Sequence, residues 1–294
     1  MNINELIKTE GAVVTDGSMG SYLEKLGYAG ITPELASVEE PGLVASVHGE
    51  YVKSGASVII TNTFGANAKR LARKKLEGEI EAINGKSCEI AARARGGKDV
   101  LVAGDVGPSG ELLEPYGSLT SGEAEEIFLR QADMLKKGGV DFILLETFQD
   151  LKEIDLAYNI IREKLDIFVL PSIALTSGGE NRTLMGQKIE DLVKWAEDKD
   201  VFGVNCGVGS TEMKAVVRRI RELTGMPLWV KPNAGVPGVS GGKTFYPEEV
   251  EEFTSNCMEM VDAGVKFIGG CCGTTPVYIE QLKKKIDEKS RGRF

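Results

Sequence analysis

The stretch VKFIGGCCGTTP, residues 265–276, gives the pattern from which we interpret the rest of the chain. Its first four residues form a strand-like run. Two glycines then lead into the adjacent cysteines Cys271 and Cys272. A second run of the same kind, residues 201–205, leads directly into Cys206. Three thiols at the ends of two strands predict a single metal site.

Short apolar runs rich in β-branched residues alternate along the whole chain with longer amphipathic runs. Strands that are apolar throughout are typical of a parallel sheet covered on both faces. We predict eight strands, over residues 12–15, 58–61, 100–103, 142–145, 167–173, 201–206, 228–231 and 265–271. We predict helices over residues 41–54, 151–164, 189–198, 212–223, 247–263 and 277–288. A further helical region runs from the end of the second strand, at residues 62–63, to about 95 with a break near 78, and another helix starts at about 120.

Eight strand–helix units in 294 residues predict a single (β/α)₈ TIM barrel, with one domain spanning residues 1–294. An open doubly wound sheet is the alternative. That fold would place a glycine-rich dinucleotide loop after the first strand, and the residues Gly17-Ser18-Met19-Gly20 lack its full spacing.

Composition and charge restrict the class of partner. The net charge of −9 argues against nucleic acid or an anionic membrane as the main partner. No apolar stretch approaches the length that spans a membrane, and the first residues do not resemble a signal peptide. We therefore expect a cytoplasmic protein, in which its five cysteines stay reduced.

Polar residues stand at the carboxyl ends of the predicted strands. In barrel enzymes the active site lies at these ends. A lone acidic residue at such a position is more often a cap, and Asp105 fits that interpretation. A lone buried cysteine is usually inert, which we expect of Cys88 and Cys257 inside helices. The strand-end set is Asp16, Thr63, Asp105, Glu146, Cys206, Asn233, Cys271 and Cys272.

The three strand-end cysteines favour zinc, because thiolates do not suit metals that prefer oxygen ligands. Adjacent residues on a regular strand face opposite ways, so both members of the cysteine pair can bind one ion only if the strand turns; Gly269, Gly270 and Gly273 permit that turn. Three protein ligands leave a fourth position open, as in catalytic zinc sites. A disulfide between Cys271 and Cys272 is the competing interpretation.

Such a centre carries a net charge of about −1, so it generates hydroxide poorly and binds a further thiol well. A free thiol has a pKa of about 8.5, and binding to zinc deprotonates it at neutral pH. The sulfur can then attack an alkyl carbon without a protein base. This suits a chain whose single histidine, His48, we interpret as a surface or packing residue.

Several motifs resemble the homocysteine S-methyltransferase family, and most of all the homocysteine-binding module of cobalamin-dependent methionine synthase. The resemblance covers essentially the whole chain. The motifs are DGSMG (16–20), TNTFGA (61–66), GDVGP (104–108), LETF (145–148), VNC (204–206), KPNAG (231–235) and GGCCGTTP (269–276).

The resemblance implies Zn²⁺ on Cys206, Cys271 and Cys272, with the homocysteine sulfur bound to it and methionine as the product. It further implies that the homocysteine ammonium meets Glu146 and Asp16. It also implies that the homocysteine carboxylate binds the backbone N–H groups of Gly17, Ser18 and Met19 and lies near Thr63. Asn233 would line the zinc pocket or fill the open position of the zinc ion.

The methyl donor is not decided by these motifs. At 294 residues we expect no room for folate, corrinoid or reactivation modules. The resemblance therefore implies a methyl-corrinoid, methylcobalamin, supplied by a partner corrinoid protein. Relatives that use S-methylmethionine carry the same three cysteines, so that donor is an alternative.

Two other functions are kept open. A Schiff-base lyase could use Lys231 near the end of the seventh strand. A non-catalytic subunit could bind zinc and the thiol without transferring a methyl group. The glycine-rich residues 235–244 we interpret as a lid or surface loop.

Overall fold

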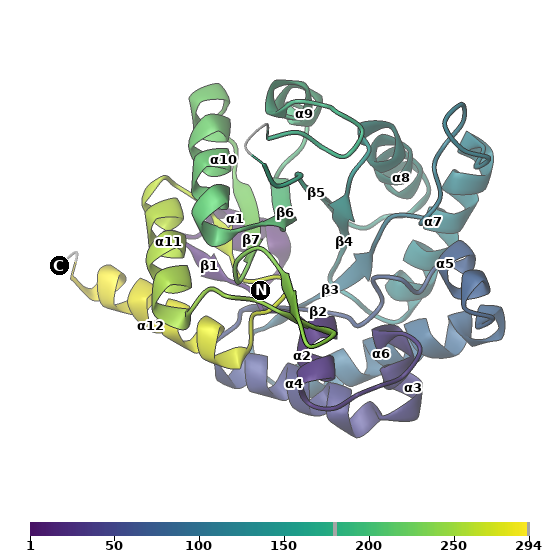
Figure 1. Cartoon of the computed structure of the whole chain (residues 1–294), viewed down its shortest axis with the longest axis horizontal. Helices are drawn as coiled ribbons and strands as arrows, with labels where there is room; N and C mark the ends of the chain where they lie inside the picture. The colour runs from purple at the N-terminus through teal and green to yellow at the C-terminus, as the bar shows by residue number, and fades with distance from the viewer. Residues whose placement is uncertain (179–180, 293–294) are drawn as a thin grey trace.

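Eight strands form one barrel in the computed structural model, which describes residues 1–178 and 181–292 (Figure 1). All neighbouring strands in the ring pair in parallel. The barrel strands are β1 (Val13–Val14), β2 (Val58–Ile60), β3 (Leu101–Val106), β4 (Phe142–Phe148), β5 (Val169–Ile173), β6 (Phe202–Gly209), β7 (Leu228–Asn233) and β10 (Phe267–Ile268).

The sheet closes between its first two strands. The strand order is β1-β10-β7-β6-β5-β4-β3-β2, and a parallel bridge between Thr15 and Val58 joins its two ends. The Ser57 N–H donates to the Val14 carbonyl at 2.8 Å, which continues this junction. The predicted barrel is therefore confirmed, and the open sheet that we kept as an alternative is wrong.

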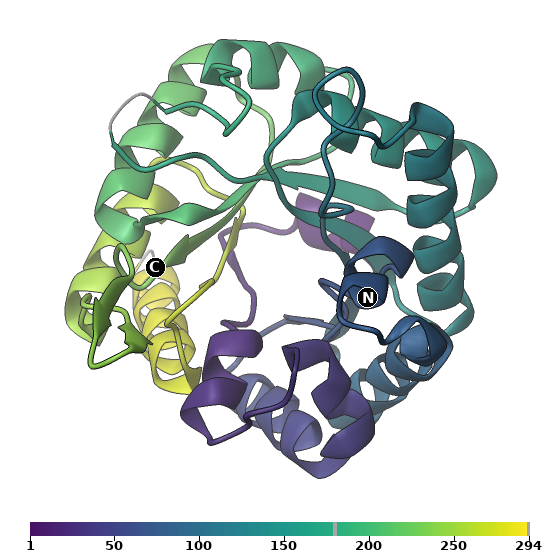
Figure 2. The same ribbon diagram turned by 45° about the vertical axis from the view of Figure 1, so that its right-hand side comes forward.

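Helices surround the barrel and cover its outer face (Figure 2). A capping box formed by Thr120 and Glu123 starts α7, and the predicted break near residue 78 is a short 3₁₀ turn, Glu77–Glu79. The helices are α1 (Ile3–Lys8), α2 (Gly20–Lys25), α3 (Ala36–Glu39), α4 (Pro41–Lys53), α5 (Ala68–Arg73), α6 (Ile80–Arg95), α7 (Ser121–Lys137), α8 (Leu151–Lys164), α9 (Ile189–Ala196), α10 (Ser210–Leu223), α11 (Val250–Asp262) and α12 (Pro276–Arg291).

The inside of the barrel is apolar at one end and polar at the other. Trp229, Phe142 and Phe267 fill the end where the strands begin, and α1 closes it with Ile3 and Leu6. Residues two positions apart on a strand face the same side. Lys231 follows Trp229 at that spacing, so it also points into the barrel, toward the carboxyl ends of the strands. The polar end is the one that carries the candidate site.

Two elements differ from the sequence-based expectation. The residues that we expected to form a lid or surface loop contain a β-hairpin, β8 (Gly238–Ser240) and β9 (Lys243–Phe245). Its turn residues Gly241 and Gly242 have φ values of +57° and +76°. Two consecutive positive values are typical of a tight hairpin turn, which glycine adopts readily. The hairpin lies beside α2 and α12 (Figure 1).

The second difference is that β6 does not end at Cys206 but continues to Gly209, with its register to β7 shifted between Asn205 and Gly209. The strand therefore contains an irregularity at the candidate metal ligand. Among the described residues, no helix combines the length and the apolar character needed to cross a membrane.

Candidate metal centre and the adjoining cavity

The thiols of Cys206, Cys271 and Cys272 lie within 4.8 Å of one another at the mouth of the barrel. A tetrahedral zinc ion with Zn–S bonds of about 2.3 Å places its sulfur ligands roughly 3.8 Å apart. The three sulfurs therefore need only small movements to bind one ion. The cysteines are free, so the alternative of a Cys271–Cys272 disulfide is not what the structure contains. The predicted cluster of three cysteines is confirmed, and it suggests a zinc site.

Cys206 reaches this position because its backbone is left-handed. Its φ is +56°, and that of Gly207 is +73°. A non-glycine residue with positive φ is uncommon and is often found at functional positions. The turn redirects the strand inside β6, where a Cβ on residue 207 would collide with the Leu175 carbonyl. Glycine at that position allows the close approach that points the Cys206 side chain at its two partners.

The pair Cys271 and Cys272 follows β10 across two glycines that have no space for a side chain. A Cβ at Gly269 would meet the Thr15 hydroxyl, and one at Gly270 would meet the Thr274 side chain. The Cys271 N–H donates to the Pro232 carbonyl at 2.8 Å. These close contacts hold the turn beside β1 and β7.

Asn233, at the end of β7, lies behind the metal site. Its Oδ1 accepts a hydrogen bond from the backbone N–H of Cys272 at 3.1 Å. In this arrangement the Asn233 side chain orients a candidate ligand through its backbone.

Tyr246 was not among the site residues that we predicted. It follows the β8–β9 hairpin, and its ring packs where a Cβ on Gly273 would otherwise lie. Hydrogen bonds from Cys206 and Cys271 lower the pKa of Cys272 to about 3 against the effect of burial, and a bond from the Tyr246 hydroxyl adds to them. In the sequence only the neighbouring glycines mark this segment, and they indicate a turn rather than a contact.

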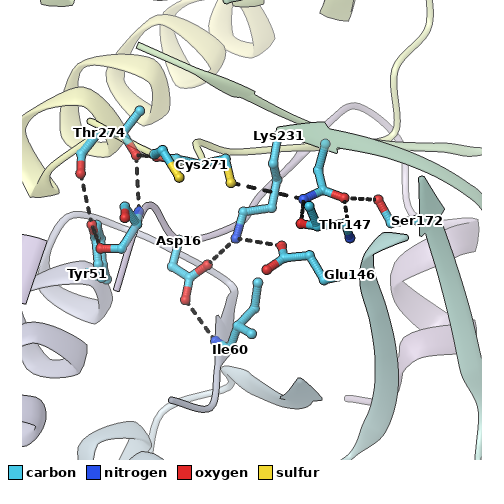
Figure 3. Close-up of polar contacts among 12 residues, drawn as sticks. Asp16, Tyr51, Ile60, Glu146, Thr147, Ser172, Lys231, Cys271 and Thr274 are labelled. Atoms are coloured by element: carbon cyan, nitrogen blue, oxygen red, sulfur yellow. Dashed lines mark hydrogen bonds and ion pairs between the residues drawn. The ribbon is translucent and has the colours of Figure 1, made fainter. Parts of the chain in front are cut away.

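A second network supports the cysteines from the side of β5 and β6. The Asn205 amide donates to the Thr147 hydroxyl at 2.7 Å, and its oxygen accepts from the Ser172 hydroxyl at 2.6 Å. The same amide lies 4.0 Å from the Cys271 sulfur (Figure 3). Sequence reasoning missed Thr147 and Ser172, because nothing in their spacing distinguishes them from ordinary strand residues.

A cavity of about 240 Å³ at the mouth of the barrel adjoins the three cysteines. Its walls come from loops that follow several strands, so residues far apart in the sequence meet there. Of the predicted residues, Asp16, Gly17, Ser18, Met19, Thr63, Asp105, Glu146, Cys206, Cys271 and Cys272 line it, joined by Lys231 and Glu34, whereas Asn233 is not among the lining residues.

Lys231 forms a buried ion pair in this cavity. Its ammonium lies 2.7 Å from Asp16 Oδ1 and 4.0 Å from Glu146 Oε1 (Figure 3). Burial opposes the charge of Lys231, and the carboxylates of Asp16 and Glu146 outweigh that effect, so its pKa is raised. A nucleophilic amine has to be neutral, which makes the Schiff-base alternative unfavourable.

Asp105 and Glu146 each have a buried oxygen, Oδ1 and Oε1, that accepts no hydrogen bond from the described residues. Burial raises the pKa of Glu146 to about 7, and the charges of Asp16 and Cys272 act in the same direction, while Lys231 opposes them. Burial and the nearby Glu146 also raise the pKa of Asp105. Asp105 is 4% exposed and lines the cavity, so the expectation that it caps a loop is wrong.

The loop after β1 forms another wall of the cavity. The Ser18 N–H donates to the Thr274 hydroxyl at 3.1 Å, and the Tyr51 hydroxyl donates to the Ser18 carbonyl at 2.7 Å (Figure 3). The Ser18 N–H is therefore engaged within the protein. Thr63 donates its hydroxyl to the Asp105 carbonyl at 2.7 Å.

The remaining cysteines and the histidine do not line this cavity. Cys88 and Cys257 are buried on α6 and α11, as expected of inert core thiols. His48 is fully buried on α4, and neither of its ring nitrogens has a hydrogen-bond partner among the described residues. It is a packing residue, and the surface position that we also allowed is wrong.

Comparison with known proteins shows that this chain is similar to a family of enzymes. A profile of the family described as homocysteine S-methyltransferase matches residues 13–286. Methionine synthase of Mycobacterium tuberculosis is 28% identical over 301 residues, which cover 95% of this chain and 25% of that protein. Methionine synthase of Mycobacterium leprae is 27% identical, with coverages of 96% and 25%. The chain thus spans about a quarter of the length of the curated relatives that it matches.

Solved structures of a homocysteine methyltransferase from Escherichia coli, MmuM, share the fold. The metallated form superimposes with a TM-score of 0.80 at 24% sequence identity, covering 96% of this chain and 99% of that one. The oxidised form gives a TM-score of 0.79 at 25% identity with the same coverages.

Proposed function

Because this chain belongs to the homocysteine S-methyltransferase family, we propose that it transfers a methyl group to the sulfur of L-homocysteine and releases methionine. The observation that carries this proposal is the position of the three thiols. Cys206, Cys271 and Cys272 lie together on the wall of a cavity whose other wall holds carboxylates. A ligand with a thiol at one end and an ammonium at the other matches both walls.

The donor set fits zinc. Cys206, Cys271 and Cys272 would hold the ion, and no fourth protein ligand among the described residues joins their cluster. Zinc, when bound, supplies a Lewis acid that keeps an added thiol deprotonated at neutral pH. The protein contributes the orientation of the ligands through Asn233 and Asn205, and a cavity beside them.

The other predicted residues would hold the amino-acid part of the substrate. Glu146 faces the cavity, where its Oε1 accepts no hydrogen bond from the described residues and lies 4.0 Å from the Lys231 ammonium, and it would receive the ammonium of the substrate. Asp16 would contribute negative charge to this part of the cavity, although its Oδ1 already accepts a hydrogen bond from Lys231. The substrate carboxylate would lie on the loop at Gly17 and Met19, near Thr63, with the Ser18 N–H holding that loop to Thr274.

We favour a methyl-corrinoid carried by a partner protein as the donor. The similarity to methionine synthases supports this donor. A cleft of about 940 Å³ beside the hairpin also reaches Cys272, with Phe245, Tyr246 and Tyr278 among its lining residues. It offers a donor a second approach to the metal site. S-methylmethionine is the alternative donor, because a site of three cysteines is compatible with either donor.

A donor panel tests the proposal. Zinc-loaded protein is incubated with L-homocysteine and, in separate reactions, methylcobalamin, S-methylmethionine, S-adenosylmethionine or betaine, and methionine is quantified. We expect methionine from methylcobalamin, and methionine from S-methylmethionine alone would establish the alternative donor. Zinc and homocysteine binding without any product would instead support the non-catalytic function.

The matched control in this panel is the triple variant Cys206→Ala, Cys271→Ala, Cys272→Ala. We expect it to keep the helical circular dichroism of the barrel and to lose both zinc and product. Full activity in this zinc-free variant would refute the metal-based mechanism.

A further inference from the structure

A buried carboxylate outside the cavity joins two of the segments that carry the cysteines. Glu248 is 5% exposed and lies between the β8–β9 hairpin and α11, two residues after Tyr246. It is not among the residues that line the cavity at the barrel mouth or the cleft beside the hairpin. Burial of a carboxylate costs free energy unless hydrogen bonds satisfy it, so the partners of Glu248 indicate its role.

The Glu248 carboxylate caps α10 from a distant part of the chain. Its Oε2 accepts from the Ser210 N–H at 3.2 Å, and its Oε1 accepts from the Ser210 hydroxyl and, at 3.0 Å, from the Asn256 amide. Gly209, the residue before α10, makes no side-chain cap of its own. The helix dipole also favours a negative charge at this end. Glu248 therefore fixes the point at which β6 passes into α10.

The backbone of Glu248 is joined to the loop that carries Cys272. Its N–H donates to the Ala234 carbonyl at 3.1 Å, and the Ala234 N–H donates to the Cys272 carbonyl at 3.0 Å. The packing here is close, because a Cβ on Gly235 would lie 3.2 Å from the Glu248 Cβ. Glu248 thus connects the Cys272 loop, through Ala234, with the segment that follows Cys206.

The backbone between Cys206 and Ser210 needs such an anchor. A φ of +56° at Cys206 is unfavourable for a residue with a side chain, and strain of this kind persists only where the surrounding structure fixes it. In regular strand geometry neighbouring side chains face opposite sides. Cys206 would then face away from Asn205, whose amide lies 4.0 Å from the Cys271 sulfur. The bonds from Glu248 to Ser210 oppose that change.

We infer that Glu248 is a positioning residue for the metal centre, because its hydrogen bonds to Ser210 keep the Cys206 thiol within reach of an ion bound by Cys271 and Cys272. The inference rests on the proposed function only for the presence of a metal ion on the three cysteines. The partners of the Glu248 carboxylate are groups of Ser210 and Asn256, so it acts on the Cys206 ligand through the chain between residues 206 and 210.

Glu153 provides a matched control elsewhere in the barrel. It is 6% exposed, and its Oε1 accepts from the N–H of Ser109 at 2.9 Å and from the hydroxyl of the same residue. Ser109 lies four residues after Asp105, in a loop that contains no cysteine. Glu248→Met and Glu153→Met each keep the approximate length of the side chain and remove the carboxylate that holds a serine after a barrel strand.

The test uses Co²⁺, whose bonds to thiolates give a charge-transfer absorption that grows with the number of sulfur ligands. Metal-free wild type, Glu248→Met and Glu153→Met are titrated with Co²⁺, and affinities are measured by competition with a chelator. We expect Glu248→Met to bind Co²⁺ roughly tenfold or more weakly than wild type, as on the loss of other groups that orient ligands. At saturation it should lack the absorption that one thiolate contributes. Glu153→Met should keep the affinity and the absorption of wild type, although urea unfolds both variants earlier.

Wild-type affinity and absorption in Glu248→Met would overturn the inference. Equal losses in Glu153→Met would also overturn it, because they would show that removal of any buried carboxylate loosens the site. If Glu248→Met does not fold, Glu248→Gln, which keeps one acceptor oxygen, is judged by the same criteria. A wild type that binds no Co²⁺ would overturn the inference too. A wild type that binds Co²⁺ through three thiolates but makes no methionine from any donor would refute the proposed function alone.

Discussion

The Lys231 ammonium and the Asp16 carboxylate form an ion pair of 2.7 Å between side chains that are each 3% exposed. Residue 231 lies on β7, the seventh barrel strand in chain order, two residues before its end, and residue 16 follows the first strand. The ion pair therefore links β7 to the loop that follows β1. Removing one partner would leave the other charge buried without compensation, which typically costs about 3–5 kcal/mol.

We predict that Lys231→Met lowers the free energy of unfolding by roughly that amount, and that Asp16→Asn in the same chain restores most of it. Urea unfolding at pH 7 measures both. The control is Lys266→Met, whose ammonium donates to the carbonyls of Thr9 and Gly11 and, among the described residues, to no carboxylate. Asp16→Asn should not rescue that variant, and a double variant as unstable as Lys231→Met alone would contradict the prediction.

A second prediction concerns Asn233, whose Oδ1 accepts the Cys272 N–H at 3.1 Å. Asn233→Leu keeps the approximate size of the side chain and removes the acceptor. Groups that orient metal ligands typically change metal affinity by roughly 10- to 100-fold when lost. We expect a loss of zinc affinity in that range, measured by competition with a chelator. Asn233→Asp retains the acceptor and should bind zinc nearly as well as wild type; equal affinity in both variants would argue against this role.

A third prediction concerns Tyr246. Tyr246→Phe keeps the ring that packs on Gly273 and removes the hydroxyl that bonds to Cys272. Because that bond helps to lower the pKa of Cys272 to about 3, its loss should raise the pKa. In metal-free protein the alkylation of Cys272 by iodoacetamide, followed by mass spectrometry from pH 3 to 8, should therefore begin at higher pH.

The matched control for Tyr246→Phe is Tyr278→Phe. Tyr278 lines the same cleft but donates its hydroxyl to the Glu248 carbonyl at 2.7 Å. This variant should alkylate as wild type does. A shift of the same size in both variants would mean that the cleft, rather than the Tyr246 hydrogen bond, controls the thiol.

The barrel and the cysteine cluster could be predicted from the sequence because both depend on local signals. Eight apolar runs with cysteines at the ends of two of them are visible along the chain, and a parallel barrel brings all strand ends to one mouth. The partners of Lys231 could not be predicted in this way. Its contact with Asp16 joins residues 215 positions apart, and no spacing rule relates them.

The hairpin and Tyr246 show a different limit. The Gly241-Gly242 pair between strand-like residues is a hairpin signal that the sequence analysis did not use. Even with the hairpin recognised, the position of Tyr246 against Gly273 depends on how two loops pack. The left-handed backbone at Cys206 was equally hidden, because a cysteine with a φ of +56° carries no local signature. Such positions depend on tertiary contacts that override local preference.

The last prediction concerns the pH dependence of stability, to which His48 and Glu146 contribute with opposite sign. Burial lowers the pKa of His48 to about 4, so its contribution to stability is present above about pH 6.5 and is lost as the pH falls toward 4. Burial raises the pKa of Glu146 to about 7, so its contribution is present below about pH 4.5 and is lost as the pH rises toward 7. In the wild type the two effects partly offset each other.

Single variants should separate them. Relative to wild type, His48→Leu should gain stability as the pH falls from 6.5 to 4, by on the order of 3 kcal/mol for a pKa of about 4. Glu146→Gln should gain relative stability as the pH rises from 4.5 to 7. Urea midpoints at half-unit pH intervals measure both differences. Parallel pH profiles for wild type and either variant would show that the replaced group does not change its protonation in this range, because a group that titrates equally in both states contributes no slope.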